Sequence, residues 1–90
     1  MITSLFDLGD RVITPNALEQ LFPDDITASM NRHANGDWGE LCAHDRGENE
    51  RSLREGGRLF SLYRDRNGVK FYIITECNRS ATTVLLPEDY

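Results

Sequence analysis

The sequence lacks the features that mark membrane, secreted and disulfide-rich proteins. Its apolar runs fall far short of the ~18 residues that a membrane-spanning helix needs, and its first residues carry no basic segment of the kind that opens a signal peptide. It has only two cysteines, Cys42 and Cys77, too few for a disulfide framework. We therefore expect a cytoplasmic protein with free thiols and no membrane partner.

Motifs that bind cofactors or metals are also missing. The sequence contains no phosphate-binding glycine loop, no H-E-x-x-H helix, no G-x-S-x-G elbow and no EF-hand loop. The residues that could ligate a transition metal, His33, Cys42, His44 and Cys77, do not have the spacing of a zinc site. We therefore expect no cofactor and no metal, and we assign no catalytic residue.

Composition and charge indicate one folded domain covering residues 1–90. Hydrophobic residues make up 39% and charged residues 28%, which is ordinary for a globular chain of this length. The net charge of −5 is uneven: residues 1–45 carry eight carboxylates against two arginines, and residues 46–90 carry eight basic groups against seven acids. An acidic protein is a poor generic binder of nucleic acid, because neutralising phosphates supplies most non-specific affinity. Direct nucleic-acid binding is therefore not expected.

The last third of the chain predicts a three-stranded antiparallel meander over about 58–87. Residues 59–63, 69–75 and 82–86 are rich in β-branched and aromatic side chains. Asn-Gly between two such runs is a strong hairpin signal. With Asn67 and Gly68 as the two central turn residues, Asp65 would face Lys70 in a cross-strand ion pair.

The same register predicts which side chains form the core. The apolar set at alternate positions is Phe60, Leu62, Phe71, Ile73, Val84 and Leu86. The opposite face mixes Tyr63, Tyr72 and Ile74 with Lys70 and Glu76. Because that face is not purely polar, we expect something to cover part of it. The sequence leaves open whether a helix, a partner or solvent covers the rest, and this is the face where we look for a partner.

The first half of the chain predicts two to three short helices within about 14–56. Thr14 and Pro15 form a helix start, and the D-x-x-E spacing of Asp45 and Glu48 resembles a capping box that opens a helix closed by Gly56. A short strand is expected at 11–13. Helices that precede consecutive strands are typical of an α+β domain, here with the helices packed on one face of the sheet.

Residues 32–40 contain a histidine, two carboxylates and a tryptophan within a short span. One interpretation makes Asp37 or Glu40 a general acid–base residue beside His33, with Trp38 lining a pocket. The other makes Trp38 a core residue and Asp37 a turn residue that binds nearby amides. The candidate interaction or pocket residues are His33, Asp37, Trp38, Glu40, Tyr63, Lys70, Tyr72 and Arg79.

Several segments resemble a family of short, uncharacterised proteins from bacterial plasmids and integrated mobile elements. They are residues 5–9 (LFDLG) with 14–18 (TPNAL), 32–39 (RHANGDWG), and 74–80 (ITECNRS) with 85–90 (LLPEDY). The resemblance implies an accessory gene of a mobile element. It implies no activity and no catalytic residue.

Three functional hypotheses remain. The first is a non-enzymatic accessory or regulatory module that binds another protein, for instance an inhibitor of a host defence nuclease. The second is a small hydrolase or toxin-type nuclease that uses residues 32–40 or a basic strand face. That face would comprise Arg58, Arg64, Lys70, Tyr72, Arg79 and Tyr90. The third is a structural subunit of a homo-oligomer, since the sequence leaves the oligomeric state open.

Overall fold

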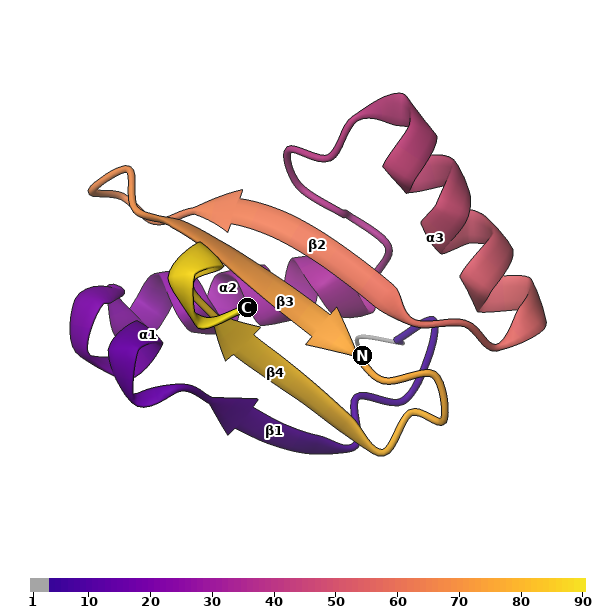
Figure 1. Ribbon diagram of the computed structural model, residues 1–90, viewed down its shortest axis with the longest axis horizontal. Coiled ribbons are helices and arrows are strands. Elements are labelled where there is room, and N and C mark those ends of the chain that lie inside the picture. The colour runs from indigo at the N-terminus through magenta and orange to yellow at the C-terminus, as the bar shows by residue number, and fades with distance from the viewer. Residues whose placement is uncertain (1–3) are drawn as a thin grey trace.

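The computed structural model describes residues 4–90 and confirms an α+β fold. The elements in chain order are β1 (Asp10–Ile13), α1 (Pro15–Gln20), α2 (Pro23–Ala34), α3 (Ala43–Glu55), β2 (Leu59–Arg64), β3 (Lys70–Thr75), β4 (Ala81–Leu85) and the 3-10 helix η1 (Pro87–Asp89) (Figure 1). None of the helices in the described part of the chain has the length and apolar character needed to cross a membrane.

The sheet is mixed and has four strands in the order β1-β4-β3-β2, so the prediction of a three-stranded antiparallel meander was incomplete. β2, β3 and β4 do form an antiparallel meander. The strand expected at 11–13 is β1, and it pairs in parallel with β4. The amide N–H of Asp10 donates to the carbonyl of Ser80 at 2.9 Å, and the N–H of Thr14 donates to the carbonyl of Val84 at 3.0 Å. β4 is therefore an internal strand.

The predicted register of the β2–β3 hairpin was wrong by one residue. Arg64 lies opposite Lys70, and Leu62 lies opposite Tyr72. The carboxylate of Asp65 accepts hydrogen bonds from the N–H groups of Asn67 at 2.9 Å and Val69 at 3.0 Å. Asp65 is thus a buried turn residue rather than the ion-pair partner of Lys70. Its bonds close a loop over residues 65–69 instead of a two-residue turn.

Because side chains alternate across a strand, this one-residue difference turns β2 over. Tyr63 is only 1% exposed and lies in the core on the α2 face, whereas the sequence pattern places it on the opposite face with Tyr72. Phe60 and Leu62 are half-buried on the opposite face, so their assignment to this core was wrong. The other four predicted core residues are buried as expected: Phe71, Ile73, Val84 and Leu86.

The helix boundaries follow the local sequence. Thr14 caps α1 by accepting a hydrogen bond from the N–H of Ala17, as predicted. Gly56 ends α3 in the left-handed conformation, with φ of 82°. The predicted capping box was wrong, because α3 begins at Ala43, before Asp45, and has no side-chain cap.

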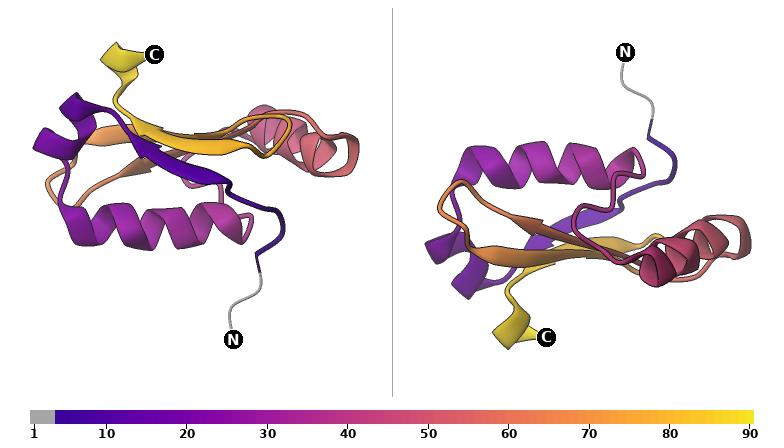
Figure 2. Two further views of the ribbon diagram at one scale, coloured as in Figure 1. Left: turned by 90° about the horizontal axis from the view of Figure 1, so that it is seen from below. Right: turned by 90° about the horizontal axis from the view of Figure 1, so that it is seen from above.

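The layers are asymmetric (Figure 2). α2 covers one face of the sheet, η1 lies against the other face, and α3 lies beside the β2 edge. The expectation that the helices share one face therefore holds for α2 and not for α3. The main core lies between α1, α2 and the sheet, and a second cluster of Trp38, Leu41 and Leu59 lies toward α3.

Candidate functional site

Asp37 is held by its neighbours in residues 32–40. Its carboxylate accepts two hydrogen bonds from the Arg32 guanidinium, at 2.8 and 3.1 Å, and one from the N–H of Gly39 at 3.2 Å. The Arg32 hydrogen bonds lower the pKa of Asp37, which outweighs the opposing effect of partial burial. Asp37 is therefore an ionised residue that fixes a turn.

His33 points away from Asp37 and into the sheet. Its Nδ1 lies 2.6 Å from the Ser61 hydroxyl, and its Nε2 lies 2.8 Å from the Thr75 hydroxyl. The ring is fully buried, and burial lowers its pKa to about 4, with a smaller contribution from the positive charge of Arg79. At neutral pH His33 is an uncharged member of a buried hydrogen-bond network. The structure therefore does not bring His33 and Asp37 together.

Trp38 and Glu40 seal the outer edge of β2. Trp38 is 4% exposed, and its indole N–H donates to Glu50 at 3.1 Å. The N–H of Leu62 donates to the carbonyl of Trp38 at 3.2 Å, and the N–H of Glu40 donates to the carbonyl of Leu62 at 2.7 Å. The Glu40 carboxylate pairs with Arg64 at 3.0 Å. The backbone of this segment thus behaves as a short extra strand.

The same edge is closed further along β2 by Asn49. Its amide group donates to the carbonyl of Phe60 at 2.7 Å and accepts from the N–H of Phe60 at 3.1 Å. Asn49 is 3% exposed although it lies on the very polar α3. Between Asn49 and residues 38–40, β2 offers no open edge to another strand.

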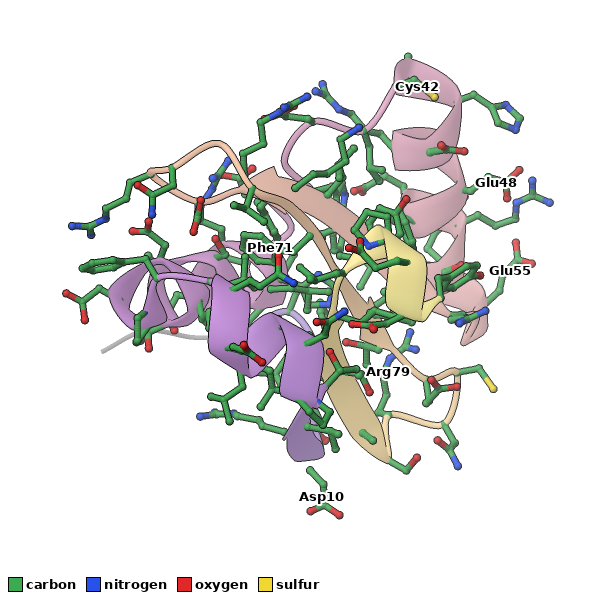
Figure 3. All side chains as sticks on the ribbon, turned by 60° about the vertical axis from the view of Figure 1, so that its left-hand side comes forward. Asp10, Cys42, Glu48, Glu55, Phe71 and Arg79 are labelled. Carbon is green, nitrogen blue, oxygen red and sulfur yellow. The ribbon has the colours of Figure 1, made fainter. Side chains whose placement is uncertain are left out.

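Tyr63 and Arg79 also have structural contacts. The Tyr63 hydroxyl donates to the carbonyl of Asp37 at 2.5 Å, and burial raises the pKa of the phenol. The Arg79 guanidinium donates to the carbonyls of Gly57 at 2.6 Å and Ser52 at 3.1 Å, which ties the β3–β4 turn to the end of α3. Figure 3 shows Arg79 beside this turn.

Tyr72 and Lys70 lie on the sheet face opposite α2. The Tyr72 ring contacts Phe60, with centroids 4.7 Å apart, and Tyr90, with centroids 6.0 Å apart. Lys70 is exposed beside Arg64, its cross-strand neighbour. This face therefore has a small aromatic cluster with basic residues at one end, and η1 covers part of it.

The free edge of β1 is a feature that the sequence did not predict. Asp10 and Thr14 direct their N–H groups to β4, so the alternation of a parallel ladder turns the N–H and C=O groups of Arg11 and Ile13 outward. No hydrogen bond from the described residues reaches those outward groups. Figure 3 shows the Asp10 side chain projecting from this outer edge. β1 is thus the one strand of the described sheet whose outer edge has no backbone or side-chain partner.

A groove lies between this edge and α2. It encloses about 220 Å³, and its walls combine apolar side chains with a polar end. The apolar lining residues are Val12, Ile13, Ile26, Met30 and Val84, and the polar ones are Arg11, Thr27 and Asn31. Arg11 also borders a second hollow of about 460 Å³, which Asp7 and Arg79 line. We name the first hollow the β1–α2 groove.

The histidine, cysteine and carboxylate side chains of residues 4–90 do not meet the requirements of a metal site. No group of three or more histidine, cysteine or carboxylate residues within residues 4–90 could hold a metal ion. Both cysteines are exposed and free. Comparisons with protein-family models, with curated proteins and with solved structures find no match to this chain.

Proposed function

We propose that the protein is a non-enzymatic protein-binding module that receives an extended segment of a partner protein along β1. The observation that carries this proposal is the unpaired edge of β1 beside the β1–α2 groove. An extended peptide that adds to a sheet edge gains affinity from main-chain hydrogen bonds and specificity from pockets for alternate side chains. The outer edge of β1 offers the main-chain hydrogen bonds, and the adjacent β1–α2 groove offers the pocket.

The chemistry of the edge favours a polypeptide over other occupants. Arg11 and Ile13 each present one N–H donor and one C=O acceptor, spaced as in a strand. An incoming strand matches all four groups, and each hydrogen bond contributes about 0.5–1.5 kcal/mol net. The apolar part of the groove adds room for a side chain, whose burial contributes about 1.5–3 kcal/mol for a residue such as leucine.

The contacts of the candidate catalytic residues support the non-enzymatic part of the proposal. The Asp37 carboxylate is bonded to Arg32 and Gly39, and the His33 imidazole is buried between two hydroxyls. A general acid–base pair needs its members within hydrogen-bond reach of each other or of a substrate. These two groups instead stabilise the turn and the core.

A matched pair of substitutions at Arg11 tests strand addition. Arg11→Pro removes the outward N–H without touching the ladder to β4, whereas Arg11→Val removes the same side chain and keeps the N–H. A phage library of random dodecapeptides selected on the wild-type protein supplies the probes. We expect the enriched peptides to slow hydrogen exchange at Arg11 and Ile13, and to bind Arg11→Pro about 10-fold more weakly than Arg11→Val.

Two results would overturn the proposal. One is equal affinity of the two variants, with both folded by their amide NMR spectra. The other is self-association of the wild type, seen by sedimentation and abolished by Arg11→Pro. That second result would identify another copy of the chain as the occupant of the edge, as the homo-oligomer hypothesis requires.

The resemblance to mobile-element proteins suggests a host defence nuclease as the partner. This identity is tested by measuring how well the wild-type protein protects a plasmid from restriction or CRISPR interference. We expect protection by the wild type and by Arg11→Val, and its loss with Arg11→Pro. Equal protection by all three, or by none, would contradict a nuclease partner bound at this edge.

A further inference from the structure

The side chains along β1 also indicate the sequence of the segment that binds there, an inference that rests on the proposed strand addition. Arg11 and Ile13 lie opposite Thr82 and Val84 and share the α2 face of the sheet. Val12 lies between them on the other face and is 46% exposed. The groove therefore contacts every second residue of an added strand.

The two contact positions differ in chemistry. One part of the groove lining is apolar and includes Ile13, Ile26, Met30 and Val84. The rest of the lining is polar, with Arg11, Thr27 and Asn31, and contains no carboxylate. An apolar side chain thus fits opposite Ile13, and a hydrogen-bond acceptor fits opposite Arg11.

The guanidinium of Arg11, which has no ion-pair partner among residues 4–90, makes a carboxylate the preferred acceptor. The neighbouring hollow is lined by Arg11 and Arg79 with one carboxylate, that of Asp7. The other carboxylate close in sequence, Asp10, precedes Arg11 and lies on the other face of β1. Arg79 binds only backbone carbonyls, so its charge is not neutralised by an acid. The net −5 of the chain has little effect at this point, because charges beyond about 8 Å are screened at physiological salt.

We infer that the β1–α2 groove selects an extended segment with an apolar residue and an acidic residue two positions apart. The order of the two residues reports the direction of the added strand. An antiparallel segment reads apolar-x-acidic from its N-terminus, because it meets Ile13 before Arg11. A parallel segment reads acidic-x-apolar.

A double-mutant cycle tests this specificity. The probes are four capped nonapeptides of threonine and valine that carry Leu-x-Asp, Asp-x-Leu, Leu-x-Asn or Asn-x-Leu at the centre. They are titrated against the wild type, Arg11→Gln and Arg11→Pro by fluorescence anisotropy. We expect one of the Asp peptides to bind the wild type about 5-fold more tightly than its Asn counterpart, and this preference to vanish in Arg11→Gln. The same preference should weaken as salt is raised.

The possible results distinguish the preference for a carboxylate at Arg11 from the addition of a strand to β1. Peptides that bind the wild type and lose affinity in Arg11→Pro, but show no Asp preference or keep it in Arg11→Gln, overturn the carboxylate inference and leave strand addition standing. Peptides whose affinity is the same for all three proteins overturn strand addition itself. An Asp preference in the wild type that survives at high salt also counts against an ion pair at Arg11.

Discussion

Acidification is expected to destabilise this protein through His33. The unfolded chain binds a proton at the ordinary histidine pKa of about 6.5, whereas the buried ring binds one only near pH 4. Unfolding therefore takes up a proton between these values, and the free energy of unfolding falls as the pH is lowered from about 6.5 to about 4. A difference of about 2.5 pH units at about 1.36 kcal/mol each corresponds to roughly 3 kcal/mol. That is a large fraction of the 5–15 kcal/mol typical of a domain.

Urea unfolding of the wild type and of His33→Gln at several pH values between 7 and 4 measures this contribution. A glutamine amide can still hydrogen-bond the hydroxyls of Ser61 and Thr75, but it does not titrate. We expect the wild type to lose about 3 kcal/mol more than the variant over this range. His44 offers a matched control, because its side chain is 81% exposed and His44→Gln removes the other imidazole without entering the core.

Parallel curves of stability against pH for the wild type and His33→Gln would refute this reasoning. A titration of the His33 ring nitrogens by NMR gives a second, independent check, since a midpoint near 6.5 would also contradict it. Titration of the carboxylates affects stability at a lower pH than titration of His33. The pKa values of Asp25, Asp37 and Asp89 are lowered by their hydrogen bonds, so their contributions are lost below about pH 4.

Two further predictions concern the β2 edge. Gly39 has φ of 75° and no space for a Cβ against the Leu62 carbonyl, whereas Gly56 has φ of 82° with open space around it. In urea unfolding, Gly39→Ala is therefore expected to lower the free energy of unfolding by more than about 2 kcal/mol, and Gly56→Ala by about 1 kcal/mol. Equal losses for the two variants would contradict the close approach of Gly39 to the Leu62 carbonyl. Asn49→Ala removes both hydrogen bonds to the Phe60 backbone and is expected to cost about 1–3 kcal/mol in the same assay. A loss below about 0.5 kcal/mol, the range of a surface change, would show that this closure is not needed.

The sequence predicts the elements of this fold better than their pairing. The strands and the caps at Thr14 and Gly56 depend on local patterns, and these predictions were confirmed. The hairpin register depends on Asp65, whose carboxylate also accepts a hydrogen bond from the N–H of Phe22 at 3.1 Å. That contact joins distant parts of the chain, so an Asn-Gly pair read alone gives the wrong turn.

The β1–α2 groove was missed for a similar reason. A short strand at 11–13 is visible in the sequence, but its free edge exists only because β1 pairs with β4 on one side and faces α2 across the groove. Nothing within residues 10–13 specifies either neighbour. The buried position of Tyr63 was equally hidden, since it follows from the register.

The position of β4 has a consequence for how the chain folds as it is made. Synthesis runs from the N-terminus, yet the strand that joins β1 to the rest of the sheet is the last of the four to leave the ribosome. Until residues 81–85 emerge, β1 has no partner and β3 has one bare edge. Only the β2–β3 hairpin and the helices can form before that moment, because a contact between distant segments must wait for both of them. Completion of the sheet is therefore a late event that depends on the nascent chain remaining unaggregated while β3 is uncovered.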